Sequence, residues 1–252
     1  MIGVFDSGIG GLSVLSALRA AYPEADLLYY ADTARLPYGG RSPALIRRFA
    51  REAGERFAAF GVDYLAVACG TVSALALDAI ADAANCPVSG VVLPVVRAIV
   101  RDGRRRVLIL STEATANSRV FEKELAARAP GVDLLSLGCP LFVPLVENGV
   151  FAPNDPALLS LLGRTLSPGM TFFPDAVLLG CTHFRLLSPA IASLFSGVPL
   201  YDCGEAAAGA VPERFGRGNG TLRIFVSDGP DAFRRAALRA GGLPDGVEIG
   251  TV

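Results

Sequence analysis

Two stretches of the sequence place a cysteine directly after a short apolar run. Cys69 follows the run at residues 64–68, and Cys181 follows the run at residues 177–180. His183, two residues after Cys181, is the only histidine in the chain. Short apolar runs that stop at small or polar residues are typical of buried strands. Because an ionised thiol can act as a base or a nucleophile, the two matching strand ends predict two thiols that face each other across one site.

A single cysteine at a strand end is most often a small buried residue. A matching pair, one member of which lies beside the only histidine, favours chemistry instead. The other three cysteines are weaker candidates: Cys86 and Cys139 precede prolines as small apolar fillers, and Cys203 stays ambiguous. The odd number of cysteines argues against a disulfide framework, and one histidine is too few for usual zinc spacing, so we expect no metal.

Two acids accompany the thiols. Asp6 ends the first apolar run and is followed by Ser7 and a glycine-rich turn at residues 8–11. Glu147 closes the apolar run at residues 139–146, where a partly buried carboxylate could orient an imidazole or raise its pKa. The only lysine, Lys123, lies between two glutamates on the expected solvent face of a helix, which disfavours pyridoxal phosphate chemistry.

The glycine turn leaves a second class of function open. A nucleotide-dependent oxidoreductase would bind phosphates at residues 8–11 and a ribose through Asp32, at the end of the next strand. However, Ser13 stands where the fingerprint has its last glycine, and Asp6 would place a negative charge near the pyrophosphate.

Strands and helices alternate along the chain. We expect strands at residues 2–5, 26–31, 64–68, 88–92, 107–110, 132–137, 177–180 and 222–226, and helices at 12–21, 43–60, 72–84, 117–129, 158–166, 186–195, 206–211 and 231–240. This alternation predicts an α/β fold with mostly parallel sheets, whose ligands bind at the carboxyl ends of the strands. The order of elements repeats once, so we expect two similar domains: residues 1–92 with 205–252, and residues 93–204.

Composition fits a soluble globular protein. Of 252 residues, 52% are apolar and 19% are charged, and the net charge of −1 provides no basic surface for nucleic acid. The longest apolar stretch, at residues 91–100, is interrupted by Pro94 and Arg97 and is too short to cross a membrane. With no secretion signal at the start, we expect a cytoplasmic protein.

Taken together, the motifs resemble those of glutamate racemase, the cofactor-independent type of the aspartate/glutamate racemase superfamily. The resemblance runs the whole length and is carried by Asp6-Ser7-Gly8-x-Gly10-Gly11, Pro37-Tyr38-Gly39, Cys69-x-Thr71, the run from Cys139 to Glu147, and Gly180-Cys181-Thr182-His183, with looser fits at Ser111-Thr112-x-x-Thr115 and Asp202-x-Gly204.

The resemblance implies two flavodoxin-like three-layer domains, related by a pseudo-twofold axis, with the active site in the cleft between them. It implies a cytoplasmic homodimer that needs no cofactor and converts L-glutamate to D-glutamate for peptidoglycan. Cys69 would deprotonate the D-isomer with the help of Asp6, and Cys181 the L-isomer with the help of His183 and Glu147. The substrate would be held by Asp6, Ser7, Pro37, Tyr38, Gly39, Gly70, Thr71, Thr115, Thr182 and His183.

Inverting a carbon without redox chemistry needs one base on each face, which agrees with two thiols from two half-domains. Two positions depart from the family. Gly70 replaces the usual asparagine and should leave a hole the size of an amide, and Phe184-Arg185 replaces Tyr-Pro and adds a cation. Gly70 therefore leaves open a racemase of another small acidic amino acid, and a decayed, non-catalytic binding protein is the third alternative.

Overall fold

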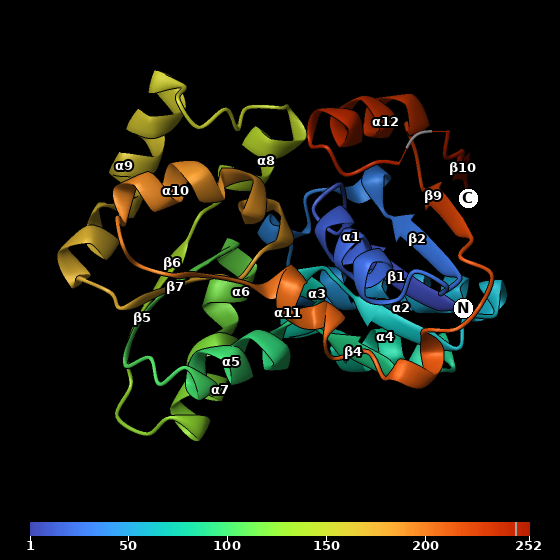
Figure 1. The fold of residues 1–252 in the computed structure, drawn as a ribbon, viewed down its shortest axis with the longest axis horizontal. Helices are drawn as coiled ribbons and strands as arrows, with labels where there is room; N and C mark the ends of the chain where they lie inside the picture. Colours follow the sequence, from blue (N-terminus) through green and yellow to red (C-terminus); the bar gives the residue numbers. More distant parts are fainter. Residues whose placement is uncertain (245) are drawn as a thin grey trace.

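The computed structural model describes residues 1–244 and 246–252. Its chain forms two parallel β-sheets that lie side by side, each flanked by helices (Figure 1). Both chain ends lie in the lobe that contains the first sheet. Among the residues described, no helix is long and apolar enough to cross a membrane.

The first sheet has six strands in the order β10-β9-β2-β1-β3-β4, and all of its pairs are parallel. The strands are β1 (Ile2–Asp6), β2 (Leu27–Ala31), β3 (Tyr64–Val67), β4 (Val88–Gly90), β9 (Leu222–Val226) and β10 (Ile249–Thr251). The last two strands bring the end of the chain back to this sheet. Strands β1, β2 and β3 are buried along their whole length, as expected of a parallel sheet covered on both faces.

The second sheet has four parallel strands in the order β6-β5-β7-β8. They are β5 (Arg106–Ser111), β6 (Asp133–Gly138), β7 (Ala176–Leu179) and β8 (Leu200–Asp202). Numbered from its own first strand, each sheet contains the order 2-1-3-4, which is the core of the flavodoxin-like arrangement. The α/β fold class with two parallel sheets is therefore confirmed, and β3 and β7 hold equivalent places.

Helices cover both faces of each sheet. The first sheet is flanked by α1 (Leu12–Ala21), α2 (Pro43–Phe60), α3 (Gly70–Leu75), α4 (Leu77–Ala84), α11 (Cys203–Ala208) and α12 (Pro230–Arg239). The second has α5 (Val92–Arg101), α6 (Glu113–Ser118), α7 (Val120–Arg128), α8 (Phe142–Glu147), α9 (Pro156–Phe172) and α10 (Ser188–Leu194). Short 3₁₀ helices are η1 (Thr33–Arg35), η2 (Tyr38–Gly40), η3 (Thr182–Leu187) and η4 (Glu213–Phe215).

Several expected boundaries were wrong. The helix predicted at 72–84 is broken at Ala76 into α3 and α4, and the helix predicted at 117–129 is broken at Arg119, whose φ of 56° is left-handed. The strand expected at 88–92 ends at Gly90 because helix α5 begins at Val92. Pro94 is tolerated in α5 because the first turn of a helix does not use its backbone N–H groups.

Candidate active site

The two thiols singled out from the sequence lie at equivalent positions. Cys69 follows β3 in the first sheet, and Cys181 follows β7 in the second. Both side chains are buried, and both line the same cavity between the sheets. Two similar α/β units facing each other with the carboxyl ends of their strands thus bring together residues that are far apart in the chain.

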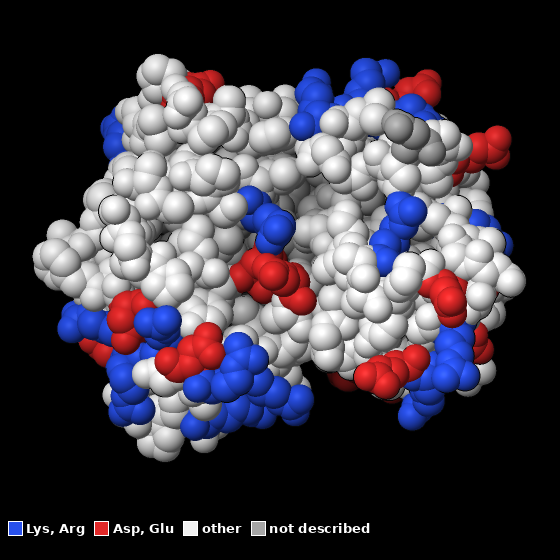
Figure 2. Space-filling view, viewed as in Figure 1, with Lys and Arg blue, Asp and Glu red and all other residues white. Residues whose placement is uncertain are grey.

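The cavity is nearly closed. Its volume is about 10 Å³, which is room for about one water molecule. Of the residues predicted to form the site, it is lined by Asp6, Ser7, Pro37, Tyr38, Gly39, Cys69, Gly70, Thr71, Cys181, Thr182 and His183, and it is also lined by Thr112 and Val143. On the face shown in Figure 2 a hollow lies between the lobes, with basic and acidic side chains next to each other at its edge and most other charged side chains toward the periphery.

Hydrogen bonds join the two sides of the cleft. The Thr71 and Thr112 hydroxyl oxygens are 3.0 Å apart, and the Thr182 hydroxyl donates to Asp6 at 3.0 Å. The backbone N–H of Ile9 donates to the Glu147 carboxylate at 2.9 Å. A substrate larger than a water molecule must therefore enter after some of these bonds open.

Cys181 contacts an imidazole, and that imidazole contacts a carboxylate. The Cys181 sulfur is 3.8 Å from His183 Nδ1, and His183 Nε2 is 2.6 Å from Glu147 at the end of α8. Burial lowers the pKa of His183, but the hydrogen bonds to Cys181 and Glu147 outweigh it and raise the pKa well above 6.5. The sequence-based expectation that Glu147 orients an imidazole agrees with this contact.

Asp6 lies between the two halves of the site. It is fully buried, accepts hydrogen bonds from the Gly8 backbone N–H and from Thr182, and has no hydrogen bond to Cys69. Burial raises the pKa of Asp6, although the His183 charge opposes this. Burial also raises the pKa of Cys69, and the Asp6 carboxylate adds to the effect, while the backbone N–H groups of Val72 and Thr71 oppose it.

Two predicted site residues lie behind the cavity wall. Thr115 is buried in the first turn of α6, where its backbone N–H and hydroxyl contact the Thr112 hydroxyl, and Thr112 is the one that lines the cavity. The reason is that Thr112 is the N-terminal cap of α6, so it lies one turn nearer the strand end. Glu147 likewise reaches the site through His183. Val143 lines the cavity without any sequence signal, because it is one apolar residue within an apolar run.

The hole expected beside Gly70 does not exist. A Cβ atom at Gly70 would lie 2.4 Å from the Gly180 carbonyl oxygen and 3.6 Å from the Cys181 Cα. The backbone of the opposite strand end therefore occupies the space where an asparagine side chain would begin. The expected hole is therefore wrong, whereas the absence of an amide side chain at position 70 remains as the sequence has it.

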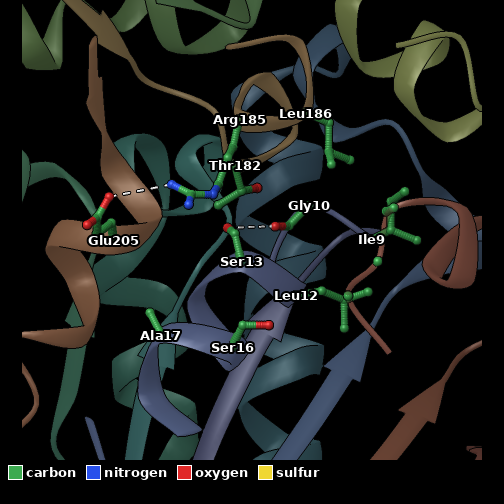
Figure 3. A pocket seen from close by; sticks show the side chains of 13 residues that line it. Ile9, Gly10, Leu12, Ser13, Ser16, Ala17, Thr182, Arg185, Leu186 and Glu205 are labelled. Atoms are coloured by element: carbon green, nitrogen blue, oxygen red, sulfur yellow. Dashed lines mark hydrogen bonds and ion pairs between the residues drawn. The ribbon is translucent and has the colours of Figure 1, made fainter. Parts of the chain in front are cut away.

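The acid that a nucleotide-dependent oxidoreductase would need for ribose binding is not accessible. Asp32 is completely buried, and it accepts hydrogen bonds from Arg35 and Tyr38, so it is not available to a ribose. Arg185, the added cation, forms ion pairs with Asp202 and Glu205. It lines a different pocket of about 410 Å³ (Figure 3), which shares Thr182 with the cavity that holds the thiols. Within the described part of the chain, no cluster of three or more potential metal ligands was found.

Comparisons with known proteins agree with this geometry. A family described as Asp/Glu/Hydantoin racemase matches residues 12–211. A glutamate racemase of Thermus thermophilus is 41% identical over 250 residues, covering 95% of this chain and 92% of the relative.

Solved structures give the same result. The glutamate racemase of Francisella tularensis, in complex with D-glutamate, superposes with a TM-score of 0.90 at 29% identity and covers 100% of this chain and 96% of its own. That of Thermus thermophilus, in complex with β-chloro-D-alanine, gives a TM-score of 0.84 at 39% identity, with the same coverage. The chain belongs to the Asp/Glu/Hydantoin racemase family, among its glutamate racemases.

Proposed function

We propose that this protein interconverts L- and D-glutamate by a two-thiol, two-base reaction. The observation that carries the proposal is that Cys69 and Cys181, which follow equivalent strands of the two sheets, line one cavity. The relatives named glutamate racemase cover nearly the whole chain, and one of them was solved with D-glutamate bound. The substrate class follows from these relatives, and the mechanism from the placement of the thiols.

In the reaction, one thiolate takes the α-proton and the opposite thiol returns a proton from the other face. Cys69 would act on the D-isomer and Cys181 on the L-isomer. One complete inversion leaves the first sulfur protonated and the second ionised, which is the state needed for the reverse reaction. Because the two bases lie on opposite faces of the carbon, inversion needs no redox step, and we propose that no cofactor is required.

The polar neighbours of the two thiols differ. The Cys181 sulfur is in contact with His183, which is held in turn by Glu147. Burial of Cys69 and, to a lesser extent, the nearby Asp6 carboxylate raise the pKa of its thiol and so disfavour its thiolate. A bound substrate ammonium would supply a positive charge there, so substrate binding itself would promote ionisation.

The remaining lining residues would hold the substrate. Ser7, Thr71, Thr112 and Thr182 carry hydroxyl groups, and the wall is completed by Pro37, Tyr38, Gly39 and Gly70. The cleft must widen to admit an amino acid and then close again. Closure would exclude water from the carbanion that forms when the α-proton is removed. Rotation of the two α/β units against each other would provide this movement, with the units proposed at residues 1–92 with 205–252 and at 93–204.

The cellular role follows from the reaction. D-glutamate produced by this enzyme would enter peptidoglycan, and we propose a cytoplasmic enzyme that acts as a homodimer. The support is the family membership and, for the described residues, the finding of no membrane-spanning helix.

The decisive experiment is exchange of the α-proton of L-glutamate in deuterated water, with purified protein and no added cofactor. We expect deuterium incorporation together with loss of optical rotation. Cys69→Ala and Cys181→Ala should each abolish inversion, and each should retain exchange only for the isomer that meets the remaining thiol. Two single variants that racemise at the wild-type rate would refute the two-thiol mechanism, and a wild-type protein inactive on glutamate but active on another amino acid would refute the substrate.

A further inference from the structure

Asp32 is a buried acid that the reaction does not use. It follows β2, and none of its surface is exposed. Its Oδ2 accepts a hydrogen bond from Arg35 Nε at 2.6 Å and another from the Tyr38 phenol, whereas Oδ1 has no partner among the described residues. A buried carboxylate is costly to the fold unless its partners compensate for lost hydration, so this position calls for an explanation.

The Tyr38 side chain reaches Asp32 with its hydroxyl group. Its ring packs against Phe5 and Phe49, with centroids 6.3 Å and 5.4 Å away. Burial raises the pKa of the phenol, and the Asp32 carboxylate raises it further, so the hydroxyl stays protonated and donates. The ring and hydroxyl of Tyr38 are engaged in this layer, and Tyr38 is also one of the residues that line the cavity.

Arg35 ties the same segment to helix α2. Its guanidinium forms an ion pair with Glu52 and lies over the ring of Phe49, 4.2 Å from the centroid. The loop that follows Asp32 is thus held at Arg35 and again at Tyr38, three and six residues along the chain. Two anchors on one buried carboxylate fix both the position and the direction of this loop.

The loop forms one wall of the cleft. Gly39 directly follows Tyr38, and a Cβ atom there would lie 2.5 Å from the Cβ of Thr112, which belongs to the opposite side. The backbone at Gly39 therefore already touches the second unit. A small shift of Tyr38 would change the width of the cleft at this point.

We propose that Asp32 is a positioning residue for substrate binding, which fixes the backbone of Tyr38 and Gly39 at the cleft wall through the Tyr38 hydroxyl and Arg35. The proposal rests on the proposed racemisation of glutamate. It assigns Asp32 to the binding step because its hydrogen bonds go to two residues of the loop and to neither thiol. Asp32, which the nucleotide alternative would place at a ribose, would thus hold a loop of the protein itself.

Asp32→Asn tests the proposal, because it keeps the shape of the side chain and removes its charge. We expect KM for glutamate to rise about tenfold while kcat stays within about threefold, since a charge-assisted hydrogen bond is lost at a place that affects binding in the ground and transition states alike. Tyr38→Phe, which removes the same bond from its other end, should also raise KM. The double variant should be no worse than Asp32→Asn alone.

Tyr22→Phe is the matched control. It removes a phenol hydrogen bond of 2.7 Å to the Val211 carbonyl, away from the cavity, and should leave KM unchanged. A wild-type KM in both Asp32→Asn and Tyr38→Phe would overturn the proposal, as would a fall in kcat alone or additive effects in the double variant. If Asp32→Asn does not fold, Tyr38→Phe carries the test by itself. Absence of racemisation by the wild-type protein would instead refute the proposed function.

Discussion

Substitution of Gly70 by alanine tests whether the close approach of the two strand ends matters for the reaction. A Cβ atom at this position would lie 2.4 Å from the Gly180 carbonyl oxygen, about 1 Å inside ordinary van der Waals contact. The Gly180 oxygen is a backbone atom and the added Cβ is fixed to the backbone of residue 70, so no side-chain rotation can relieve the overlap. The substitution must move one strand end relative to the other.

Gly180 has no room to retreat. Its backbone N–H donates to the Leu110 carbonyl at 2.7 Å, and the ring of Phe121 packs directly behind it. The overlap is therefore relieved by widening the cleft by about 1 Å. A displacement of about 1 Å between reacting groups can cost about 100-fold in rate. We therefore expect kcat/KM of Gly70→Ala to fall about 100-fold, with a change in unfolding free energy no larger than the 1–3 kcal/mol typical of overpacking.

The assay is coupled measurement of both directions of racemisation, together with urea unfolding. Gly163→Ala is the matched control, because Gly163 lies within helix α9 and a Cβ atom there meets nothing within 4 Å. It should leave activity unchanged and stabilise the protein by about 0.4–1 kcal/mol. A Gly70→Ala enzyme with kcat/KM within about twofold of wild type would show that the contact is not kept during the reaction.

Three further outcomes follow from the electrostatics. The pKa of His183 is raised above 6.5 in the folded protein. Its pairing with Glu147 should therefore stabilise the fold fully below about pH 6.5, and this contribution should be lost as the pH rises through the pKa of the folded state. In urea unfolding at several pH values, Glu147→Gln should make the free energy of unfolding less dependent on pH. Because burial raises the pKa of Asp6, its ionised carboxylate destabilises the fold at neutral pH. Asp6→Asn should therefore unfold at a higher urea concentration while losing activity, and a variant less stable than the wild type would contradict this reasoning. Arg185→Gln should keep kcat and KM within about twofold, because Arg185 is half-exposed, is paired with Asp202 and does not line the cavity. A larger rise in KM would assign the cation to the substrate.

Local pattern was sufficient for the elements that carry the thiols. The apolar runs before Cys69 and Cys181 became β3 and β7 because a short buried strand depends mainly on its own residues. The alternation of strands and helices predicted parallel sheets, since consecutive parallel strands need a crossover between them. Helix α5 was missed because Pro94 was read as an interruption, and β10 because three residues carry too little pattern.

What the sequence by itself determined was the chemistry available at each strand end: two thiols, one imidazole, and the acids Asp6 and Glu147. Only the tertiary structure decided that Thr112 rather than Thr115 lines the cavity, that Asp32 is buried under Tyr38, and that the Gly180 carbonyl fills the space beside Gly70. The physical reason is one of range. Strand ends depend on residues that are neighbours along the chain. These contacts depend instead on how closely two sheets approach each other, to within an ångström, and the spacing of residues in the sequence does not predict that distance.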